Sequence, residues 1–296
     1  MKPLSRPVYL GLVLLFCLTW SSAFPAAKLA ISVGPPLLYL AVRFGIASAL
    51  LVGLALASGD FRIGSRLGQR KVPWLRLMGL GIINLACYQG MAWLGMRSVS
   101  SGLANIVTSL NPVLISVIAV PLLGERMTGR KFGGLILGFA GAAFVVRNRV
   151  VMTGEDPTGI AFLMVGMLAM TFGTLLYKRI APGVGLVTAV GVQQLGAALA
   201  LLVGGLAIGE RFGEFVPSMM LVGTMLWFVF VVSIGAFLLW FFLLSRGTAS
   251  AASSLHFLMP PLGLLMSWAV LGEALHPLDL VGVVPVALGI RLATTP

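Results

Sequence analysis

The chain has 296 residues, of which 59% are apolar and only 9% are charged, and its mean hydropathy is +1.05. A soluble domain carries about 45–50% apolar and about 25% charged residues. The composition therefore excludes a water-soluble enzyme, a disordered chain and a disulfide-rich secreted scaffold, and it indicates a polytopic membrane protein. The two cysteines, Cys17 and Cys87, lie inside apolar runs, which predicts reduced and packed thiols.

The net charge of +12 comes from Lys and Arg residues scattered between apolar runs, which is the distribution of topology determinants. We therefore expect no binding to nucleic acid. The start, Lys2 to Arg6 followed by an apolar run, has the form of a signal peptide, but no Ala-x-Ala site closes the run. We expect this run to form the first membrane helix.

A window of about 19 residues predicts ten membrane-spanning helices, because roughly 20 apolar residues cross a bilayer. The stretches between them are polar or rich in Pro and Gly. The fifth and tenth segments are short and lie near the lower limit for spanning. The predicted segments are 8–31, 37–57, 73–94, 101–123, 132–147, 158–178, 184–207, 220–244, 249–271 and 278–292.

The distribution of positive charge predicts the orientation. With the N-terminus inside, fourteen of the twenty Lys and Arg residues fall on the inner side and five on the outer side, while Arg43 lies within the second helix. Because positively charged loops remain in the cytoplasm, we expect both termini to be cytoplasmic. The expected location is the cell inner (plasma) membrane.

The sequence aligns with itself when it is shifted by 148 residues, which is half its length. Leu123-Gly124-Glu125 falls on Leu271-Gly272-Glu273, and Pro112 falls on Pro260. Each copy has five predicted helices, an odd number, so the second copy enters the membrane from the opposite side. Such inverted repeats are typical of carriers that work by alternating access. We predict one compact all-α membrane domain built from repeats at residues 1–148 and 149–296.

Short motifs in several helices match a known family. They are Trp20-Ser21-Ser22-Ala23-Phe24 in the first helix, Arg43-Phe44 in the second, Asn111-Pro112 in the fourth, and the Leu-Gly-Glu triplets that end the fourth and ninth. The chain resembles the EamA domains of the drug/metabolite transporter superfamily over essentially its whole length. The resemblance implies a ten-helix basket whose central cavity is lined by the first, third and fourth helices of each repeat. The second copy departs from the pattern, because Met259 stands where Asn111 stands in the first.

Polar residues and a proline follow one face of two predicted helices. They are Asn105, Thr108, Ser109, Pro112 and Ser116 in the fourth helix, and Ser253, His256, Phe257 and Pro260 in the ninth. Each proline frees the carbonyl four residues earlier, and polar irregular backbone at membrane depth is tolerated where it lines a cavity. The stripes predict a substrate path, although Ser and Thr that only satisfy neighbouring helices would give the same pattern.

Aromatic and polar side chains on other helices extend this predicted site, because rings with a polar tip can clamp a small amphipathic solute. His256 could carry a proton, donate a hydrogen bond to a substrate, or only pack. Gln193 and Gln194 are expected to be helix-packing contacts. The predicted substrate-binding residues are Trp20, Tyr88, Gln89, Asn105, Thr108, Asn111, Thr171, Thr174, Ser253 and His256.

Arg43 lies about six residues inside the second helix, and we expect it to snorkel to the outer interface or to form an ion pair rather than to contact an anionic substrate. Glu125 and Glu273 end the fourth and ninth helices, where a carboxylate opposes the helix dipole. Each is expected to pair with basic groups or backbone amides. The expected packing surface of small residues on the fifth helix consists of Gly134, Gly138 and Gly141.

All eight Asp and Glu residues lie in loops or at helix ends, whereas a carrier that exchanges protons for a cationic drug needs a buried carboxylate. We therefore predict a secondary transporter that moves a small neutral or zwitterionic metabolite, such as an amino acid. A multidrug efflux carrier is the alternative; a channel and an integral-membrane enzyme fit the pattern less well. No catalytic residue, metal site or cofactor is predicted, and the expected state is a monomer or homodimer in the lipid bilayer.

Overall fold

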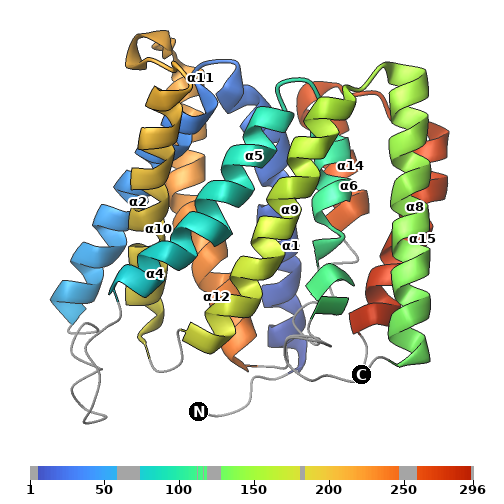
Figure 1. Ribbon diagram of the computed structural model, residues 1–296, viewed down its shortest axis with the longest axis horizontal. Coiled ribbons are helices and arrows are strands. Elements are labelled where there is room, and N and C mark those ends of the chain that lie inside the picture. Colours follow the sequence, from blue (N-terminus) through green and yellow to red (C-terminus); the bar gives the residue numbers. More distant parts are fainter. Residues whose placement is uncertain are drawn as a thin grey trace. The chain divides into compact units, whose positions relative to one another are not determined.

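The computed structural model describes residues 6–58, 74–111, 113–115, 117–118, 128–180, 184–246 and 259–294, and every regular element in these ranges is a helix (Figure 1). The chain divides into two compact units. Unit 1 comprises Met1–Pro25, Ser98–Ile160 and Leu239–Pro296, and unit 2 comprises Ala26–Arg97 and Ala161–Leu238. Each unit draws on both halves of the sequence, and each is described by itself below.

The helices are labelled as in Figure 1. In chain order they are α1 (Arg6–Ile31), α2 (Pro36–Ser58), α4 (Trp74–Gly81), η2 (Ile82–Cys87), α5 (Tyr88–Gly95), α6 (Ser101–Thr108), α8 (Gly129–Thr153), α9 (Pro157–Ile180), α10 (Leu186–Ala207), η3 (Phe212–Glu214), α11 (Met219–Leu226), η4 (Trp227–Ala236), α12 (Phe237–Arg246), α14 (Met259–Leu271) and α15 (Pro277–Thr294).

Seven helical stretches in the described ranges are long and apolar enough to cross a membrane. They are Pro7–Ile31, Pro36–Ser58, Trp74–Gly95, Gly129–Asn148, Pro157–Tyr177, Leu186–Ala207 and Met219–Trp240. Two further apolar helices are shorter, Ser101–Ile115 and Met259–Leu271. The chain is therefore a multi-pass helical membrane protein, while the count of ten spans stays a prediction.

The predicted length of the fifth segment is wrong. Instead of the short segment 132–147, α8 runs over 25 residues from Gly129 to Thr153. The charges of Arg147 and Arg149 ended the apolar window, but they do not interrupt helical backbone hydrogen bonding. The apolar window therefore measures the membrane core, and the helix extends beyond it.

In unit 2, α10 packs along α2 and α4 at points where glycine allows close approach. A Cβ placed on Gly196 would meet the backbone of Met78 in α4, with 2.7 Å to its Cα. On α2, the Ser48 hydroxyl donates to the Gly191 carbonyl of α10 at 2.8 Å. The contact is thus made of backbone and small side chains, as in other helix pairs inside membranes.

Two spans of unit 2 contain π-helical turns, which sequence reasoning did not predict. The segment η2 lies between α4 and α5, and the segment η4 lies between α11 and α12. Moving η2 by 148 residues places it at 230–235, inside η4. Since π-helical turns occur frequently at functional sites, both spans are of interest for the site.

In unit 1, α8 and α15 lie side by side and touch through their backbones (Figure 1). A Cβ on Gly141 would lie 2.7 Å from the Gly282 carbonyl oxygen, and a Cβ on Gly289 would lie 2.6 Å from the Gly134 carbonyl oxygen and still closer to the Gly138 amide nitrogen. The predicted packing role of the α8 glycines is confirmed.

Candidate functional site

Arg43 is the most unusual side chain of unit 2, because it is a cation that is completely buried in a membrane span. It lies on α2, about 10 Å along the helix axis from Pro36, at 1.5 Å per residue. Its Nε donates a hydrogen bond to the Ser233 hydroxyl of η4 at 2.9 Å. Its Nη1 and Nη2 atoms have no hydrogen-bond partner within the described residues.

Aromatic rings surround the guanidinium group. Its central carbon lies 4.4 Å from the ring centroid of Phe228, 4.5 Å from that of Phe44 and 5.9 Å from that of Trp93. Cations over aromatic faces at such distances are attracted by the ring quadrupole. We call the set of Tyr39, Arg43, Phe44, Trp93, Phe228 and Ser233 the Arg43 cluster.

The aromatic rings of the Arg43 cluster also pack on one another. The ring centroids of Trp93 and Phe228 are 5.2 Å apart, and those of Tyr39 and Trp93 are 5.3 Å apart. The Tyr39 hydroxyl donates to the Thr224 hydroxyl at 2.8 Å. Elements far apart in sequence, α2, α5, α11 and η4, therefore meet around one positive charge.

The expectation that Arg43 snorkels or forms an ion pair is wrong for the part of the chain that the structure describes. The side chain is 0% exposed, and the described residues contain no carboxylate paired with it. The physical reason is packing: Phe44, Phe228 and the Ser233 hydroxyl hold the guanidinium inside the unit.

Glu210, the acidic residue that binds the start of α2, is occupied elsewhere. Its carboxylate accepts from the amides of Leu37 at 3.2 Å and Leu38 at 2.9 Å, and it lies 3.5 Å from Nη2 of Arg97. A carboxylate at a helix N-terminus is stabilised by the dipole. Sequence reasoning placed Glu210 only in a loop; the signal it missed was Pro36, since proline favours the first helical position and leaves the next amides to be capped.

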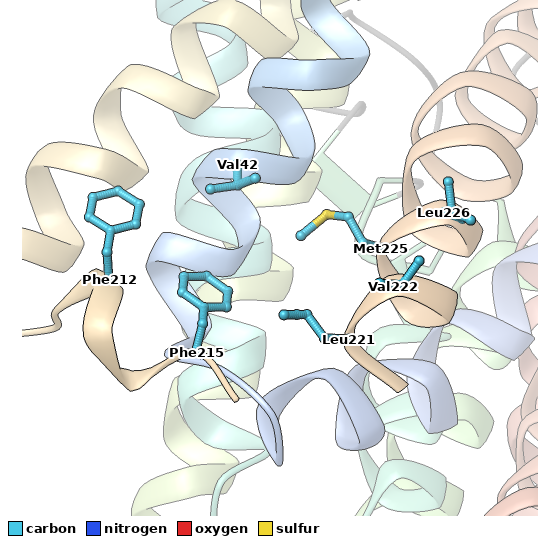
Figure 2. A pocket seen from close by; sticks show the side chains of 7 residues that line it. All are labelled: Val42, Phe212, Phe215, Leu221, Val222, Met225 and Leu226. Atoms are coloured by element: carbon cyan, nitrogen blue, oxygen red, sulfur yellow. The ribbon is translucent and has the colours of Figure 1, made fainter. Parts of the chain in front are cut away.

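A groove of about 370 Å³ lies beside α2 (Figure 2). Only apolar side chains of α2, α11 and the segment between α10 and α11 line it, namely Val42, Phe212, Phe215, Leu221, Val222, Met225 and Leu226. Such a lining offers no hydrogen bond to a charged or zwitterionic solute. The groove therefore suits an apolar chain, and it is a poor site for a polar metabolite.

Four of the predicted substrate-binding residues lie in unit 2, and all four are buried: Tyr88, Gln89, Thr171 and Thr174. The Thr171 hydroxyl donates to the Met167 carbonyl at 2.9 Å, and the Thr174 hydroxyl donates to the Met170 carbonyl at 2.8 Å. Both hydroxyl protons are thus used within α9.

Gln193 and Gln194 are buried packing residues of α10, as predicted. Gln193 Nε2 donates to the Ala189 carbonyl at 3.1 Å within its own helix, and Gln194 Nε2 donates to the Ser233 carbonyl at 2.6 Å. The second bond reaches the residue that accepts from Arg43. Gln194 therefore fixes the position of Ser233 in η4.

Unit 1 contains Trp20, Asn105, Thr108 and Asn111, all of them buried. Trp20 packs on Phe16 with ring centroids 5.4 Å apart, and the Thr108 hydroxyl donates to the Ala104 carbonyl of its own helix at 2.8 Å. The remaining predicted residues, Ser253 and His256, lie outside the described residues, as do Pro112, Ser116, Glu125 and Phe257 of the stripes and triplets.

Asn105 packs tightly against α14. A Cβ on Gly263 would collide with the Asn105 amide group, and Asn105 Nδ2 has no hydrogen-bond partner among the described residues. The Ser109 hydroxyl donates to the Asn105 carbonyl at 2.7 Å. The structure thus brings Asn105 of α6 together with Ser109, the residue that caps the C-terminus of this helix. Whether this stripe shares a cavity with the residues of unit 2 stays a prediction.

Three carboxylates hold the segment Ser98–Gly102, which leads into α6 of unit 1. The Ser98 hydroxyl donates to Asp156 at 2.9 Å, and the Ser100 amide donates to Glu155 at 2.9 Å. The Ser101 amide and hydroxyl donate to Glu273 at 2.9 and 2.8 Å, and the Gly102 amide donates to it at 3.0 Å. We call this arrangement the acid-capped segment.

Glu273 was predicted to pair with basic groups or backbone amides, and the structure shows it with backbone amides. It follows the end of α14, yet its carboxylate lies at the N-terminus of α6, where the helix dipole favours negative charge. Asp156 also caps its own helix α9, and hydrogen bonds from the Thr158 amide and the Ser98 hydroxyl lower the pKa of this carboxyl. These acids stabilise helix ends.

A chain whose described elements are all helices, with polar groups buried in its apolar spans, has the features of a polytopic membrane transporter. The sequence profile of the EamA-like transporter family matches residues 8–147 and, a second time, residues 157–295. The chain therefore belongs to the EamA-like transporter family, with two EamA domains covering it. Members of this family are transporters rather than enzymes, so a small-molecule substrate and a lipid bilayer are its partners.

Relatives are similar over nearly their whole length. The uncharacterized transporter YvbV of Bacillus subtilis is 28% identical over 302 residues, which cover 100% of this chain and 94% of YvbV. The uncharacterized inner membrane transporter YedA of Escherichia coli K12 is 24% identical, with 97% and 90% covered. A probable terminal-alkyne amino-acid exporter of Streptantibioticus cattleyicolor is 28% identical, with 91% and 88% covered. A solved crystal structure has a similar fold, with a TM-score of 0.69, 21% identity, and 98% and 97% of the two chains covered.

Proposed function

We propose that the protein is a secondary transporter that moves an amino acid or a similar neutral or zwitterionic solute across the inner membrane by alternating access. The observation that carries this proposal is the duplication: one family profile matches each half of the chain separately. Two homologous halves inserted in opposite directions can exchange conformations at similar energy, which exposes one site to either side.

The inverted ten-helix arrangement belongs to the proposal. It is supported by the π-helical turns of unit 2, because η2 moved by 148 residues falls within η4. A regular helix has no need of such turns at matching positions, so a shared ancestral feature explains them simply. In the proposed topology both termini lie in the cytoplasm, in agreement with the distribution of Lys and Arg.

The chemistry of the spans supports a solute without net positive charge. None of the seven described spans contains an aspartate or glutamate, and unit 2 instead buries a cation. A relative that is named a probable amino-acid exporter agrees with this class. In the proposal, the predicted substrate-binding residues, from Trp20 to His256, face the solute path.

Counterflow in proteoliposomes tests the proposed function. Vesicles that contain the purified protein are preloaded with unlabelled L-leucine, L-phenylalanine or L-threonine, and the uptake of the same labelled amino acid is measured. A carrier gives saturable uptake that preloading accelerates, whereas a channel gives uptake that neither saturates nor depends on preloading. Movement of ethidium with none of the amino acids moved would favour the drug-efflux alternative, for which the apolar groove of Figure 2 would be suited.

A further inference from the structure

We propose that Arg43 binds the carboxylate of the transported solute, so that the substrate class is a carboxylic acid with an apolar or aromatic side group. The inference rests on the proposed function and names the residue that recognises the substrate. Its basis is the combination of complete burial with two guanidinium nitrogens that lack a hydrogen-bond partner within the described residues.

The guanidinium group has more donors than the surrounding protein has acceptors. Arginine carries five N–H donors in a fixed planar fork, and the described residues use only the Nε donor, through the Ser233 hydroxyl. The nearby rings of Phe44 and Phe228 attract the charge, but they are not hydrogen-bond acceptors comparable to an oxygen atom. The fork formed by Nη1 and Nη2 therefore remains available to an acceptor.

A carboxylate is the acceptor that fits this fork, because its two oxygens receive two parallel N–H bonds. Ionisable groups inside membrane spans usually pair with one another or mark a substrate pathway. Pairing within the protein fails for the described part of the chain: its seven spans have no acidic residue, and Glu210 already binds two α2 amides and Arg97. The explanation that remains is that Arg43 marks the substrate pathway.

The neighbours of Arg43 can position the fork and admit a ligand. Ser233 holds Nε, and Gln194 holds the Ser233 carbonyl, so both are positioning residues. Phe228 and Ser233 both belong to η4, which has π-helical hydrogen bonding. Such hydrogen bonding is rare in proteins, and where it occurs it often lies at functional sites. Rings enclose the guanidinium in this structure, and a solute reaches it when the ring of Phe228 or Trp93 moves aside.

The aromatic rings also define the rest of the solute. Phe44, Trp93 and Phe228 lie within 6 Å of the guanidinium carbon, so the group attached to the carboxylate would contact rings rather than polar side chains. Apolar and aromatic groups gain from such contacts. A small, strongly hydrated anion without an apolar part would not.

The test compares carboxylic acids with their amides on the purified full-length protein. The probes are L-leucine with L-leucinamide, L-phenylalanine with L-phenylalaninamide, and benzoate with benzamide; benzoate lacks an amino group and reports on the carboxylate alone. The rise in melting temperature with probe concentration gives an apparent Kd. For the wild type we expect at least one acid to bind roughly 10- to 100-fold more tightly than its amide, the range of hydrogen bonds to a charged group.

Three variants distinguish the contribution of the positive charge to carboxylate binding from that of the planar guanidinium fork. Arg43→Gln should abolish the preference for the acid, and Arg43→Lys should keep part of it, because the charge remains without the planar fork. Arg43→Met is the second neutral variant, whose apolar side chain suits the surrounding rings should glutamine impair folding. The matched control is Arg97→Gln, since Arg97 is half exposed and already contacts Glu210; its preference should equal that of the wild type.

The inference is overturned if Arg43→Gln or Arg43→Met prefers the acid as strongly as the wild type, or if no acid binds the wild type better than its amide. Failure of the proposed function looks different. A wild type that binds acids through Arg43 but shows no saturable counterflow contradicts the carrier mechanism and leaves Arg43 as a carboxylate site. Normal counterflow in Arg43→Gln contradicts only the role of Arg43.

Discussion

The acid-capped segment of unit 1 and the Arg43 cluster of unit 2 differ in how their charged groups are hydrogen-bonded. In the acid-capped segment, Glu273 alone receives three hydrogen bonds of 2.8–3.0 Å from Ser101 and Gly102. In the Arg43 cluster, Nη1 and Nη2 have no hydrogen-bond acceptor among the described residues. A charge whose hydrogen-bonding capacity is filled stabilises one structure, whereas a buried charge with unfilled capacity costs stability.

This comparison makes the first prediction, which concerns Glu273. Glu273→Ala leaves two amides and a hydroxyl at the start of α6 without their acceptor, and we expect a loss of about 2–3 kcal/mol in the free energy of unfolding. The measurement is the melting temperature in detergent, with the exposed Glu214 replaced by alanine as control. An unchanged melting temperature would show that the caps carry no stability.

The second prediction has the opposite sign. Arg43→Met removes a buried charge without a carboxylate partner and fills its space with an apolar chain, so the apo protein should be as stable as the wild type or about 1 kcal/mol more stable. Stabilisation by carboxylic acids should disappear in the same variant. A loss of several kcal/mol in the apo protein would instead identify Arg43 as a structural cation and remove the contrast with Glu273.

The third prediction concerns the position of the fork. Ser233→Ala removes the acceptor for Nε and should raise the KM of counterflow about 3- to 10-fold, with a stability loss of about 1 kcal/mol. The matched control is Ser48→Ala, because the Ser48 hydroxyl is also buried in unit 2 and donates to the Gly191 carbonyl at 2.8 Å. It should lose similar stability with no change in KM; equal KM changes in both variants would contradict a positioning role.

The smallest effect is expected at Asp156, a partly exposed carboxylate that holds Ser98 in the acid-capped segment. Hydrogen bonds from Thr158 and Ser98 lower its pKa in the folded state, so its contribution to stability is present above the ordinary pKa of an aspartate and is lost as the pH falls through the lowered value. The difference in melting temperature between the wild type and Asp156→Asn should therefore shrink below about pH 4. A difference that grows on acidification would contradict this sign.

Hydropathy predicted where the helices lie but not what they contact. The segments 37–57 and 158–178 differ from α2 and α9 by one or two residues at each end, because long apolar runs have few alternatives to a membrane helix. The segment 132–147 was too short, since charged residues end the apolar run before they end the helix.

The site was predictable only where local chemistry determined it. Glu273 was expected to pair with basic groups or backbone amides, because a carboxylate is unfavourable at a helix C-terminus, and it binds amides. The environment of Arg43 depends on Phe228 and Ser233, some 190 residues further along the chain, and no local pattern reveals that distance. The π-helical turns η2 and η4 have ordinary apolar sequences. Their sequences therefore did not predict the change from α-helical to π-helical hydrogen bonding.

The glycine contacts between α8 and α15 have a mechanical consequence. Where Gly282 meets the backbone at Gly141, its chain neighbours are Val281 and Val283, and a slide by one residue would bring a branched side chain into a space that holds no Cβ. Interiors at crystal-like density do not yield to such an insertion. The two helices are therefore fixed in register. We expect them to move together as one rigid pair and not to slide along each other.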